Sequence, residues 1–561
     1  MGRSENFFSV KKYSNIGIKI DLFLIVLLAG SLICGSVSAG TFGVDFFDSP
    51  TPVGQDLSAG TITISPGDSL QDATDMAGSN GTVILNPGVY EVAGVECSEN
   101  IRFMSNSSAG GNRSNTVIVS VAENKSIISG FWVGEIVVEG LTLTNTSGRG
   151  AIADHGGRVV LISSALTHCN SERACGGGIY AGSAFVADSI ISYCYSSDGG
   201  GIYTSYGDTT IINSTIESCS GSCGGAVYVI HPFASLQLIN STISRCYAEF
   251  YGGGVCCNYN GSSITAVNTT FTNCIAGHNG GAVCGGDRSI VTVSGCTIVD
   301  CSTSDNSGIN NKYGGAVYGG EESVITIVNC RIRGCYADDD GGAVCGWKGS
   351  QIRMTGSSFE DCYAAGKGGF LRISSNSSAD VYSSRIYNCD SSDKTMVYAG
   401  VSSSVDAENN WWGSNENPSG YLSGDVDADP WLIFTSEVTP YMINRSGHSS
   451  VRAGVYSNSE GTNLSNSVCI PDGTIISFSC SRFGRIFSSQ STGTISGVSE
   501  GVFSPWSLGY YGIYSSLDDQ TINSEIIVTG DGLSELGALG FVIFVLIFIL
   551  IFTVIYYGKR R

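Results

Sequence analysis

The chain has 561 residues, which is enough for more than one domain. Charged residues make up 14% of it and 76 residues are glycine, a composition that suits a β-rich protein with many polar turns. The formal net charge of −21 argues against nucleic acid or anionic lipid as a partner, because both are bound by basic surfaces.

Residues 1–39 have the pattern of a signal peptide. Lysine and arginine residues precede an apolar run at 22–33, and the small residues at 37–39 form a cleavage pattern. An uncleaved anchor is the alternative, because the basic region is long. Both interpretations predict that the rest of the chain is exported.

A short amphipathic helix is predicted at 68–77. Its apolar face would carry Leu70, Ala73, Met76 and Ala77, and Asp68 or Ser69 would be the N-cap. The strand-like segment GTVILNPGVY at 81–90 follows directly. A helix in this position would cover the open end of a repeat structure and block pairing at its edge.

Two short phrases repeat in phase through the middle of the chain. One phrase ends in cysteine and returns nine times at intervals of 25 to 34 residues, at Cys169, Cys194, Cys219, Cys246, Cys274, Cys301, Cys335, Cys362 and Cys389. The other is a glycine pair followed by apolar residues, from GGGIY at 176–180 to GGFL at 368–371. A fixed period of this length predicts a solenoid, in which each unit buries its apolar face against its neighbours.

Apolar and small polar residues alternate with period two inside each unit, as in SIVTVSGCTIVDC at 289–301. This alternation predicts strands, and three short strands with turns fit one coil of a parallel β-helix of roughly a dozen turns at 60–430. The glycine pair would supply either a corner with positive φ or room for close packing between turns.

The paired phrases resemble the repeats of polymorphic outer membrane proteins and of adhesin-like β-helix proteins of methanogen cell surfaces. The resemblance implies a right-handed parallel β-helix of the pectin-lyase type. In those repeats the second phrase commonly ends in Asn, whereas here it ends in Cys. The phrase NNWWGSN at 409–415 is similar to the element that ends the β-helix in the methanogen proteins. Trp411 and Trp412 would either plug that end or form a platform for sugars.

Residues 431–530 lose the glycine pairs and have short alternating strands at 436–443, 450–457, 474–480, 484–489 and 524–530. This spacing predicts an Ig-like β-sandwich. The segment 470–486 resembles bacterial Ig-like group 1 domains, the stalk modules of invasin-type adhesins, whereas the segment 501–516 departs from that pattern.

The chain closes with an uncharged apolar stretch at 536–557, followed by the basic tail at 558–561. About 20 such residues span a bilayer as a helix, and the basic end marks the cytoplasmic side. The sequence therefore predicts a single-pass protein of the cell membrane, with an extracellular N-terminal ectodomain at 40–530 and a short cytoplasmic C-terminus.

The cysteines allow two interpretations. The nine cysteines of the repeated phrase would be small buried side chains at one inner corner, a cysteine ladder. The repeat register places two further pairs side by side on adjacent turns, where disulfides are possible: Cys296 with Cys330, and Cys256 with Cys284. Cys469 and Cys480 flank a strand of the predicted sandwich, and their separation of eleven residues allows a third bridge without requiring it. Free buried thiols are the alternative for these pairs. No spacing typical of a metal site is present, and no cofactor is expected.

Asn-x-Ser/Thr sequons recur along the exported part of the chain. They are candidate glycosylation sites, although a chain rich in Asn, Ser and Thr also forms sequons by chance. The sequons include those at Asn106, Asn145, Asn213, Asn240, Asn260, Asn268 and Asn376.

The resemblance and the topology together favour a non-catalytic, adhesin-like surface protein that binds extracellular glycans or the surfaces of other cells. A surface-anchored polysaccharide lyase or hydrolase is one alternative, and a purely structural envelope protein is another. An enzyme would need paired carboxylates with a basic residue nearby. The candidates for that role are Asp198, Asp338, Asp339, Asp340, Lys367 and Arg372. The residues that occupy the place of Asp340 in other repeats are so varied that a solvated turn is expected there. His155 and His278 are likewise expected to be solvent-facing turn residues.

Overall fold

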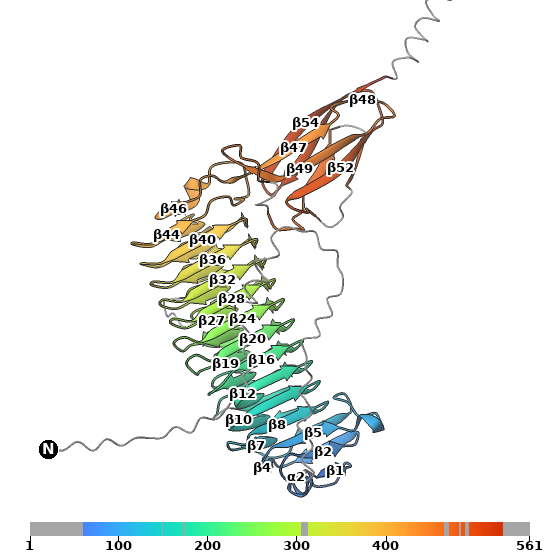
Figure 1. Ribbon diagram of the computed structural model, residues 1–561, viewed down its shortest axis with the longest axis vertical. Helices are drawn as coiled ribbons and strands as arrows, with labels where there is room; N and C mark the ends of the chain where they lie inside the picture. Colours follow the sequence, from blue (N-terminus) through green and yellow to red (C-terminus); the bar gives the residue numbers. More distant parts are fainter. Residues whose placement is uncertain are drawn as a thin grey trace, which may run out of the picture. The chain divides into compact units, whose positions relative to one another are not determined.

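The computed structural model describes residues 60–147, 150–171, 174–304, 312–464, 470–481, 484–488 and 493–530. The first part of this range forms a parallel β-solenoid of about 12 turns, as predicted, with strands of successive turns stacked in layers (Figure 1). The predicted signal peptide, membrane span and cytoplasmic tail lie outside these ranges. Within the ranges, no helix is long and apolar enough to cross a membrane.

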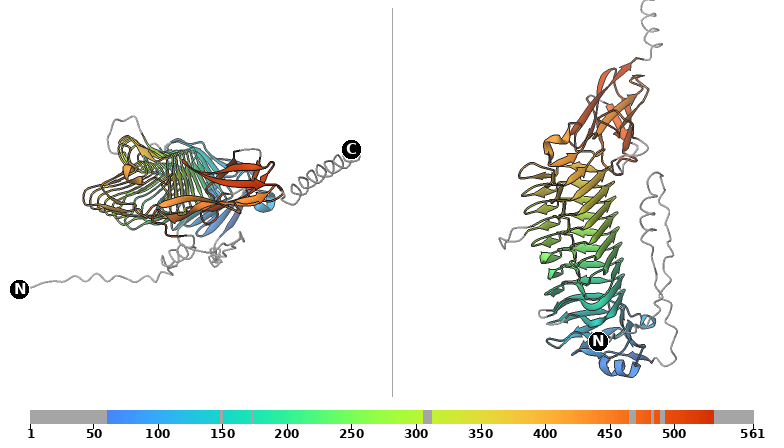
Figure 2. Two further views of the ribbon diagram at one scale, coloured as in Figure 1. Left: turned by 90° about the horizontal axis from the view of Figure 1, so that it is seen from above. Right: turned by 60° about the vertical axis from the view of Figure 1, so that its left-hand side comes forward.

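Each repeating turn contains four short strands, and each strand pairs in parallel with the same strand of the turns above and below. The strands therefore stack in columns along the solenoid (Figure 2), and the pairings define four of them. Three strands per turn were predicted, which is wrong. The two residues after each ladder cysteine form the fourth strand, as at Ile275, which pairs with Ser302 of the next turn.

The first column carries the glycine-pair phrase. Its strands are β4 (Val95–Cys97), β7 (Ile128–Gly130), β15 (Ile202–Thr204), β19 (Val227–Val229), β23 (Val255–Cys257), β27 (Val283–Gly285), β31 (Val317–Gly319), β35 (Val344–Gly346), β39 (Leu371–Ile373), β43 (Val397–Ala399) and β45 (Leu422–Ser423). Two longer strands, β10 (Ile152–Ile162) and β12 (Ile179–Ala187), run through both this column and the second.

The second column comprises β1 (Thr61–Ile64), β2 (Gly81–Leu85), β5 (Ile101–Ser105), β8 (Glu135–Glu139), β16 (Thr209–Ile212), β20 (Ser235–Ile239), β24 (Ser263–Val267), β28 (Ile290–Ser294), β32 (Val324–Val328), β36 (Gln351–Thr355), β40 (Ser378–Tyr382), β44 (Ser404–Asp406) and β46 (Asp425–Asp427).

The third column comprises β3 (Gly88–Val92), β6 (Thr116–Ser120), β9 (Thr142–Thr146), β11 (Ala165–Ser171), β13 (Ile190–Ser192), β17 (Thr215–Glu217), β21 (Thr242–Ser244), β25 (Thr270–Thr272), β29 (Thr297–Val299), β33 (Arg331–Arg333), β37 (Ser358–Glu360) and β41 (Arg385–Tyr387). The fourth comprises β14 (Tyr195–Ser196), β18 (Ser220–Cys223), β22 (Tyr247–Tyr251), β26 (Ile275–Ala276), β30 (Ser302–Thr303), β34 (Tyr336–Ala337), β38 (Tyr363–Ala364) and β42 (Asp390–Ser391).

The two glycines of each pair have different roles. The first adopts a left-handed conformation, with φ of 64° at Gly252, which a side chain disfavours. The second has no room for a side chain, because a Cβ at Gly253 would lie 2.5 Å from the carbonyl oxygen of Gly281 in the next turn. Both predicted explanations of the glycine pair are therefore correct, one for each glycine.

The nine ladder cysteines lie in the solenoid interior, and none is more than 1% exposed. Each Sγ lies close to the carbonyl oxygen two residues earlier in the chain, as at Cys246, where the distance to Ser244 O is 3.4 Å. Cysteine is small enough for the corner and can also donate weakly to this carbonyl. Burial is the largest cause that raises the pKa of Cys246, which keeps this thiol neutral.

The N-terminal end is closed by α2 (Leu70–Ala77), as predicted. Ser69 is the N-cap, and its Oγ accepts a hydrogen bond from Asp72 N at 3.1 Å. Met76 is 70% exposed, so its predicted place on the buried face is wrong. Thr74 is buried instead, because it lies on the same helix face as Leu70, Ala73 and Ala77. Its Oγ donates to Leu70 O at 2.8 Å, and this bond satisfies the hydroxyl inside the core.

The C-terminal end is closed by Trp411 and Trp412, which are 0% and 5% exposed. Trp412 packs on the solenoid core, whereas Trp411 packs with Leu432 and Phe434 of the following domain. The prediction of an aromatic plug is confirmed. The alternative of a sugar platform is wrong, because neither ring is available to a ligand.

The following domain contains two four-stranded sheets. One is formed by β47 (Leu432–Thr439), β49 (Ser449–Asn458), β52 (Val498–Pro505) and β51 (Gly484–Ser488), and the other by β48 (Met442–Asn444), β54 (Gln520–Thr529), β53 (Gly509–Leu517) and β50 (Ser477–Cys480). All of these pairings are antiparallel except β48 with β54. The segment that departs from the Ig-like pattern forms most of β52 and β53, two of the longer strands. The Ig-like family itself stays a prediction.

Two short 3₁₀ helices, η1 (Ser107–Ala109) and η2 (Pro418–Tyr421), complete the secondary structure of these ranges. The turn between β53 and β54 contacts the last turns of the solenoid. Its Asp518 accepts hydrogen bonds from Arg385 Nη2 at 2.5 Å, Arg385 Nε at 3.0 Å and Trp411 Nε1 at 2.7 Å. The two side chains of the ion pair are only 10% and 5% exposed.

Candidate functional site

The middle residue of each first-column strand faces away from the solenoid core. In successive turns these residues form an outer row: Glu96, Ser129, Ala153, Tyr180, Tyr203, Tyr228, Cys256, Cys284, Tyr318, Cys345, Arg372, Tyr398 and Ser423. Along the repeats the row is bulky, and it packs with fourth-column residues such as Phe250 and Cys223 into a second apolar cluster. Tyr203 and Tyr228 are therefore only 8% exposed.

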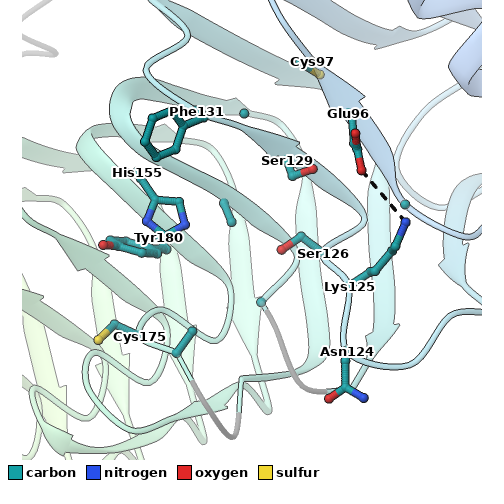
Figure 3. A pocket seen from close by; sticks show the side chains of 15 residues that line it. Glu96, Cys97, Asn124, Lys125, Ser126, Ser129, Phe131, His155, Cys175 and Tyr180 are labelled. Atoms are coloured by element: carbon teal, nitrogen blue, oxygen red, sulfur yellow. Dashed lines mark ion pairs between the residues drawn. The ribbon is translucent and has the colours of Figure 1, made fainter.

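The row changes at its N-terminal end, where Ser129 and Ala153 stand in place of tyrosine. A pocket of about 790 Å³ opens at this point (Figure 3). This volume lies within the range of small-ligand sites. The lining residues are Gly94, Glu96, Cys97, Asn124, Lys125, Ser126, Ser129, Gly130, Phe131, Gly150, Ala153, His155, Ala174, Cys175 and Tyr180. The small side chains of the row explain the hollow, because tyrosine fills the same position in the next three turns.

One wall of the pocket is aromatic. The ring of His155 lies 4.4 Å from that of Tyr180, edge to face, and 6.0 Å from that of Phe131. A bulge in β10 between Asp154 and Arg158 interrupts the pairing with β12 and carries His155. The prediction of a turn residue is wrong for His155, because it lies in β10, and the imidazole is half-buried between two rings on the pocket lining.

The other side of the pocket is polar. Ser126 is 4% exposed, and its Oγ has no hydrogen-bond partner among the described residues. Lys125 Nζ lies 3.9 Å from Glu96 Oε1, and both side chains are more than half exposed. Ser129 Oγ donates to Val95 O at 3.3 Å. The wall thus offers a hydroxyl, an ammonium and a carboxylate close together (Figure 3).

Beside the pocket, Asp154 is fully buried. Burial is the largest effect on this carboxyl and raises its pKa, although nearby backbone N–H groups such as that of Gly157 lower it in part. None of these groups reaches the carboxyl oxygens in hydrogen-bonding geometry. Burial also raises the pKa of Cys97 to about 12, and the charge of Asp154 adds to this effect. The thiol is therefore neutral near pH 7.

The structure brings together five of the six candidates for an enzyme site. Asp338 accepts hydrogen bonds from Lys312 Nζ and Tyr336 OH at 2.8 and 2.7 Å. Asp339 accepts one from Lys312 N at 2.9 Å. Lys312 is buried, so this cluster extends under the surface.

Asp340 accepts a hydrogen bond from Lys367 N at 2.8 Å, and its Oδ2 lies 3.3 Å from Arg372 Nε. The side chains of Asp340 and Arg372 are 17% and 13% exposed, so the prediction of a solvated turn is wrong. Burial raises the pKa of Asp340, and the Arg372 guanidinium opposes that shift. Arg372 also packs on the rings of Tyr313 and Trp347 at 5.2 and 4.9 Å.

Two other predicted residues lie apart from this cluster. Asp198 is in the same turn position as Asp340 but five turns away, at about 4.8 Å per turn. His278 packs against Phe250 and Tyr251 at 5.5 and 5.7 Å, and its Nε2 is buried. It is therefore half-buried, and the prediction of a solvent-facing residue is wrong. In the part of the chain that the structure describes, no group of three His, Cys, Asp or Glu residues could hold a metal ion.

The predicted disulfide partners lie on adjacent turns. Cys256 and Cys284 are register partners, and all four thiols of the two solenoid pairs are free in this structure. Cys480 is also free, and Cys469 lies outside the described residues. The bridges stay a prediction.

Cys296 and Cys330 belong to a polar ladder that was not predicted from the sequence. The ladder runs through Ser164, Ser189, Ser214, Ser241, Thr269, Cys296, Cys330, Ser357, Ser384 and Asn410. A backbone N–H of one turn donates to the side chain of the next turn, as from Thr269 N to Cys296 Sγ at 3.4 Å. The signal in the sequence is a Ser, Thr or Cys five residues before each ladder cysteine.

The sequons at Asn213, Asn240 and Asn268 have a structural origin. All three asparagines are exposed at one outer corner with φ of 48°, 50° and 49°, a conformation that asparagine tolerates. The next residue belongs to the polar ladder, and the one after it is a threonine that begins a third-column strand. Asn106 differs, because its side chain donates to Asn86 Oδ1 and accepts from Ala109 N. Asn145, Asn260 and Asn376 are exposed. Glycosylation stays a prediction at all seven sites.

No family model matches the chain, and no curated protein sequence matches it. Two similar solved structures are mutants of the tailspike protein of E. coli bacteriophage HK620 in complex with a pentasaccharide. The double mutant has 11% identity and a TM-score of 0.31, and the single mutant has 12% identity and a TM-score of 0.26. Each match covers 82% of this chain and 90% of that chain.

Domains 4 and 5 of the S-layer protein SbsC match 19% of this chain, with 13% identity and a TM-score of 0.15. This chain spans 56% of that fragment. With TM-scores of 0.31 and below, none of these matches supports an argument about this chain. The solenoid distantly resembles the β-helices of phage tailspikes.

Proposed function

We propose that the protein is a non-catalytic, adhesin-like surface protein whose solenoid wall binds glycans. The observation that carries the proposal is the pocket of Phe131, His155 and Tyr180, where rings face a polar wall. A pyranose has an apolar C–H face and a rim of hydroxyl groups, so it requires both kinds of contact in one site. The stacked strands hold these groups on a rigid scaffold, which favours a preorganised site.

The rest of the chain gives this site a place at a cell surface. In the proposal, the signal peptide exports the chain and the stretch at 536–557 anchors it in the membrane. The right-handed β-helix then displays the pocket, and the Ig-like module acts as a spacer. The acidic composition keeps such an ectodomain soluble and disfavours binding to acidic surfaces.

A polysaccharide lyase or hydrolase is the second candidate, and the cluster of Asp338, Asp339 and Asp340 favours it. General acid and base catalysis requires carboxyl groups that can reach a substrate. Here the three carboxyls accept hydrogen bonds from groups of their own and neighbouring turns, including Lys312 and Lys367. These hydrogen bonds give the three partly buried carboxyls a structural role. The adhesin-like function is therefore better supported than the enzyme.

The test uses the full-length protein in detergent on a glycan and whole-cell binding panel, with a parallel assay for cleavage of uronate polymers. Binding without turnover is the expected result. Turnover that Asp339→Ala and Asp340→Ala abolish would replace the adhesin by the enzyme. Absence of both binding and turnover would favour the purely structural envelope role.

A further inference from the structure

We infer that the pocket at Ser129 and Ala153 takes one or two uncharged pyranose rings at the end of a glycan, and that Ser126 selects them. This inference rests on the proposed function and names the ligand class of the same site. It is carried by a buried hydroxyl that has no partner among the described residues and lines the cavity, together with the shape and charge of the lining.

Ser126 Oγ is the central observation. A buried hydroxyl without a partner is costly, and nearly all such groups in folded proteins are hydrogen-bonded. Ser126 is 4% exposed, and the pocket is the space that its hydroxyl adjoins (Figure 3). A ligand hydroxyl in the pocket would satisfy it, since hydroxyl groups both donate and accept. An apolar ligand would leave it unsatisfied.

The shape of the pocket limits the size of the ligand. Toward the repeats, Tyr180 closes the outer row, and its ring is 5.2 Å from that of Tyr203. A polymer that ran along the solenoid axis would collide with this pair. A volume of about 790 Å³ suits a small ligand rather than an extended chain. The rings of Phe131 and Tyr180 then provide surfaces on which the C–H face of a sugar can pack.

The charges favour a neutral ligand. Glu96 and Lys125 are the carboxylate and the ammonium group of the lining, and their opposite charges lie 3.9 Å apart. Cys97 is a neutral thiol because burial raises its pKa to about 12. The whole chain carries a formal charge of −21, which repels acidic sugars at long range.

The experiment titrates the full-length protein with methyl glycosides of neutral hexoses and of N-acetylglucosamine, with methyl glucuronide and with a long unbranched polysaccharide. The expected result is that neutral glycosides bind and that Ser126→Ala weakens them by about tenfold, the loss of one hydrogen bond. This substitution should leave the thermal stability unchanged or higher, because it removes an unsatisfied buried oxygen. Ser289→Ala is the matched control, since its Oγ is also buried and unpartnered but belongs to the solenoid core.

A second variant tests the shape. Ala153→Tyr introduces the residue found at this place in the next three turns, and it should abolish binding by filling the pocket. Ser423→Tyr makes the same change at the other end of the row and should leave binding intact.

Glycan binding that neither Ser126→Ala nor Ala153→Tyr affects would overturn the inference and leave the adhesin-like function standing. Preference for methyl glucuronide, or for the polysaccharide over the short glycosides, would overturn the ligand class. Absence of binding to any glycan would overturn both the inference and the proposed function.

Discussion

The repeating turns of the solenoid and its two ends are stabilised in different ways. In a repeating turn every position meets its own equivalent in the next turn, as Gly253 meets Gly281 and Cys246 meets Cys274. At the ends this identity is lost. Thr146 stands in the register of Cys169, and Ala153 stands in the register of Tyr180.

This difference indicates where cavities, bulges and buried charged side chains can occur in the solenoid. The repeated phrases fill the interior positions with similar residues and leave little space there, and part of the outer row packs against the fourth column. The pocket, the β10 bulge and the buried Asp154 lie where the repeat begins, and the ion pair of Arg385 with Asp518 lies where it ends, in the last repeating turn. The repeated phrases therefore supply stability, while positions that depart from them supply the unusual groups, also within the repeat at Asp340 and Arg372.

The largest expected effect breaks the repeat itself. Gly253→Ala should destabilise the solenoid by about 4 kcal/mol or more, at the extreme for a single substitution. The new Cβ would lie 2.4 to 2.5 Å from backbone atoms of Ile275 and Gly281, which cannot move aside without breaking two turns. Urea unfolding followed by circular dichroism measures the change. Gly420→Ala is the control, because a Cβ at that position would have no neighbouring atom within 4 Å, and a similar loss there would contradict the argument.

The next effect breaks the C-terminal end. Asp518→Ala should cost about 3 kcal/mol, because it removes the closest carboxylate of the buried Arg385 guanidinium and the acceptor of Trp411 Nε1. Glu360 Oε2, 3.6 Å from Arg385 Nη1, then stays as the nearest carboxylate. Asp519→Ala is the control, since Asp519 is exposed and accepts a single hydrogen bond from Tyr387 OH at 3.1 Å. Thermal unfolding of both variants compares them. Equal melting temperatures would show that the buried pair does not stabilise this end.

Much of the repeating part could be predicted from the sequence, because its signals are local and repeat in phase. The glycine pairs and the cysteine phrase predicted parallel turns, and the Trp411–Trp412 phrase predicted a plug. The fourth strand was missed because two residues are too few to show alternation. Met76 was placed in the core by its hydrophobicity, but the buried face follows the spacing of Leu70, Ala73, Thr74 and Ala77, and Met76 lies outside it.

The candidate site could not be predicted in this way. The pocket depends on two small side chains, Ser129 and Ala153, that meet only through the register of non-repeating turns. His155 reaches its aromatic neighbours through a bulge that no sequence pattern announced. The buried state of Asp340 depends on Arg372, which comes from the next turn. These contacts join segments that share no repeated sequence motif, so no local pattern predicts them.

A smaller effect tests the buried carboxyl at the N-terminal end. Asp154→Asn should stabilise the protein near pH 7 by roughly 1 to 2 kcal/mol, because ionising an unpaired buried carboxyl is costly. Burial raises the pKa of Asp154 in the folded state above its ordinary value of 3.8. The folded state then binds the proton more tightly than the unfolded state, so the contribution is fully present below pH 3.8 and is lost as the pH rises through the folded-state pKa.

The measurement is the free energy of unfolding of wild type and Asp154→Asn at several pH values from 4 upward. The variant should lose the part of the pH dependence that comes from the Asp154 carboxyl. The difference in free energy of unfolding between the variant and the wild type should therefore increase as the pH rises. A gap that is constant across this range would show that Asp154 does not titrate differently in the folded and unfolded states.

The smallest effect concerns α2, the helix that closes the N-terminal end. Ser69→Ala should cost about 1 kcal/mol, because it removes the side-chain acceptor of Asp72 N at the helix start. Ser69→Asp should restore most of the loss, since aspartate also caps a helix and adds a negative charge near the positive end of the helix dipole. Because α2 covers only the first turns, hydrogen exchange should rise in β1 and β2 while the repeating turns keep their protection. Faster exchange throughout the repeats would instead mean that the end and the repeats unfold as one unit, and that the two regions differ in composition but not in their stability.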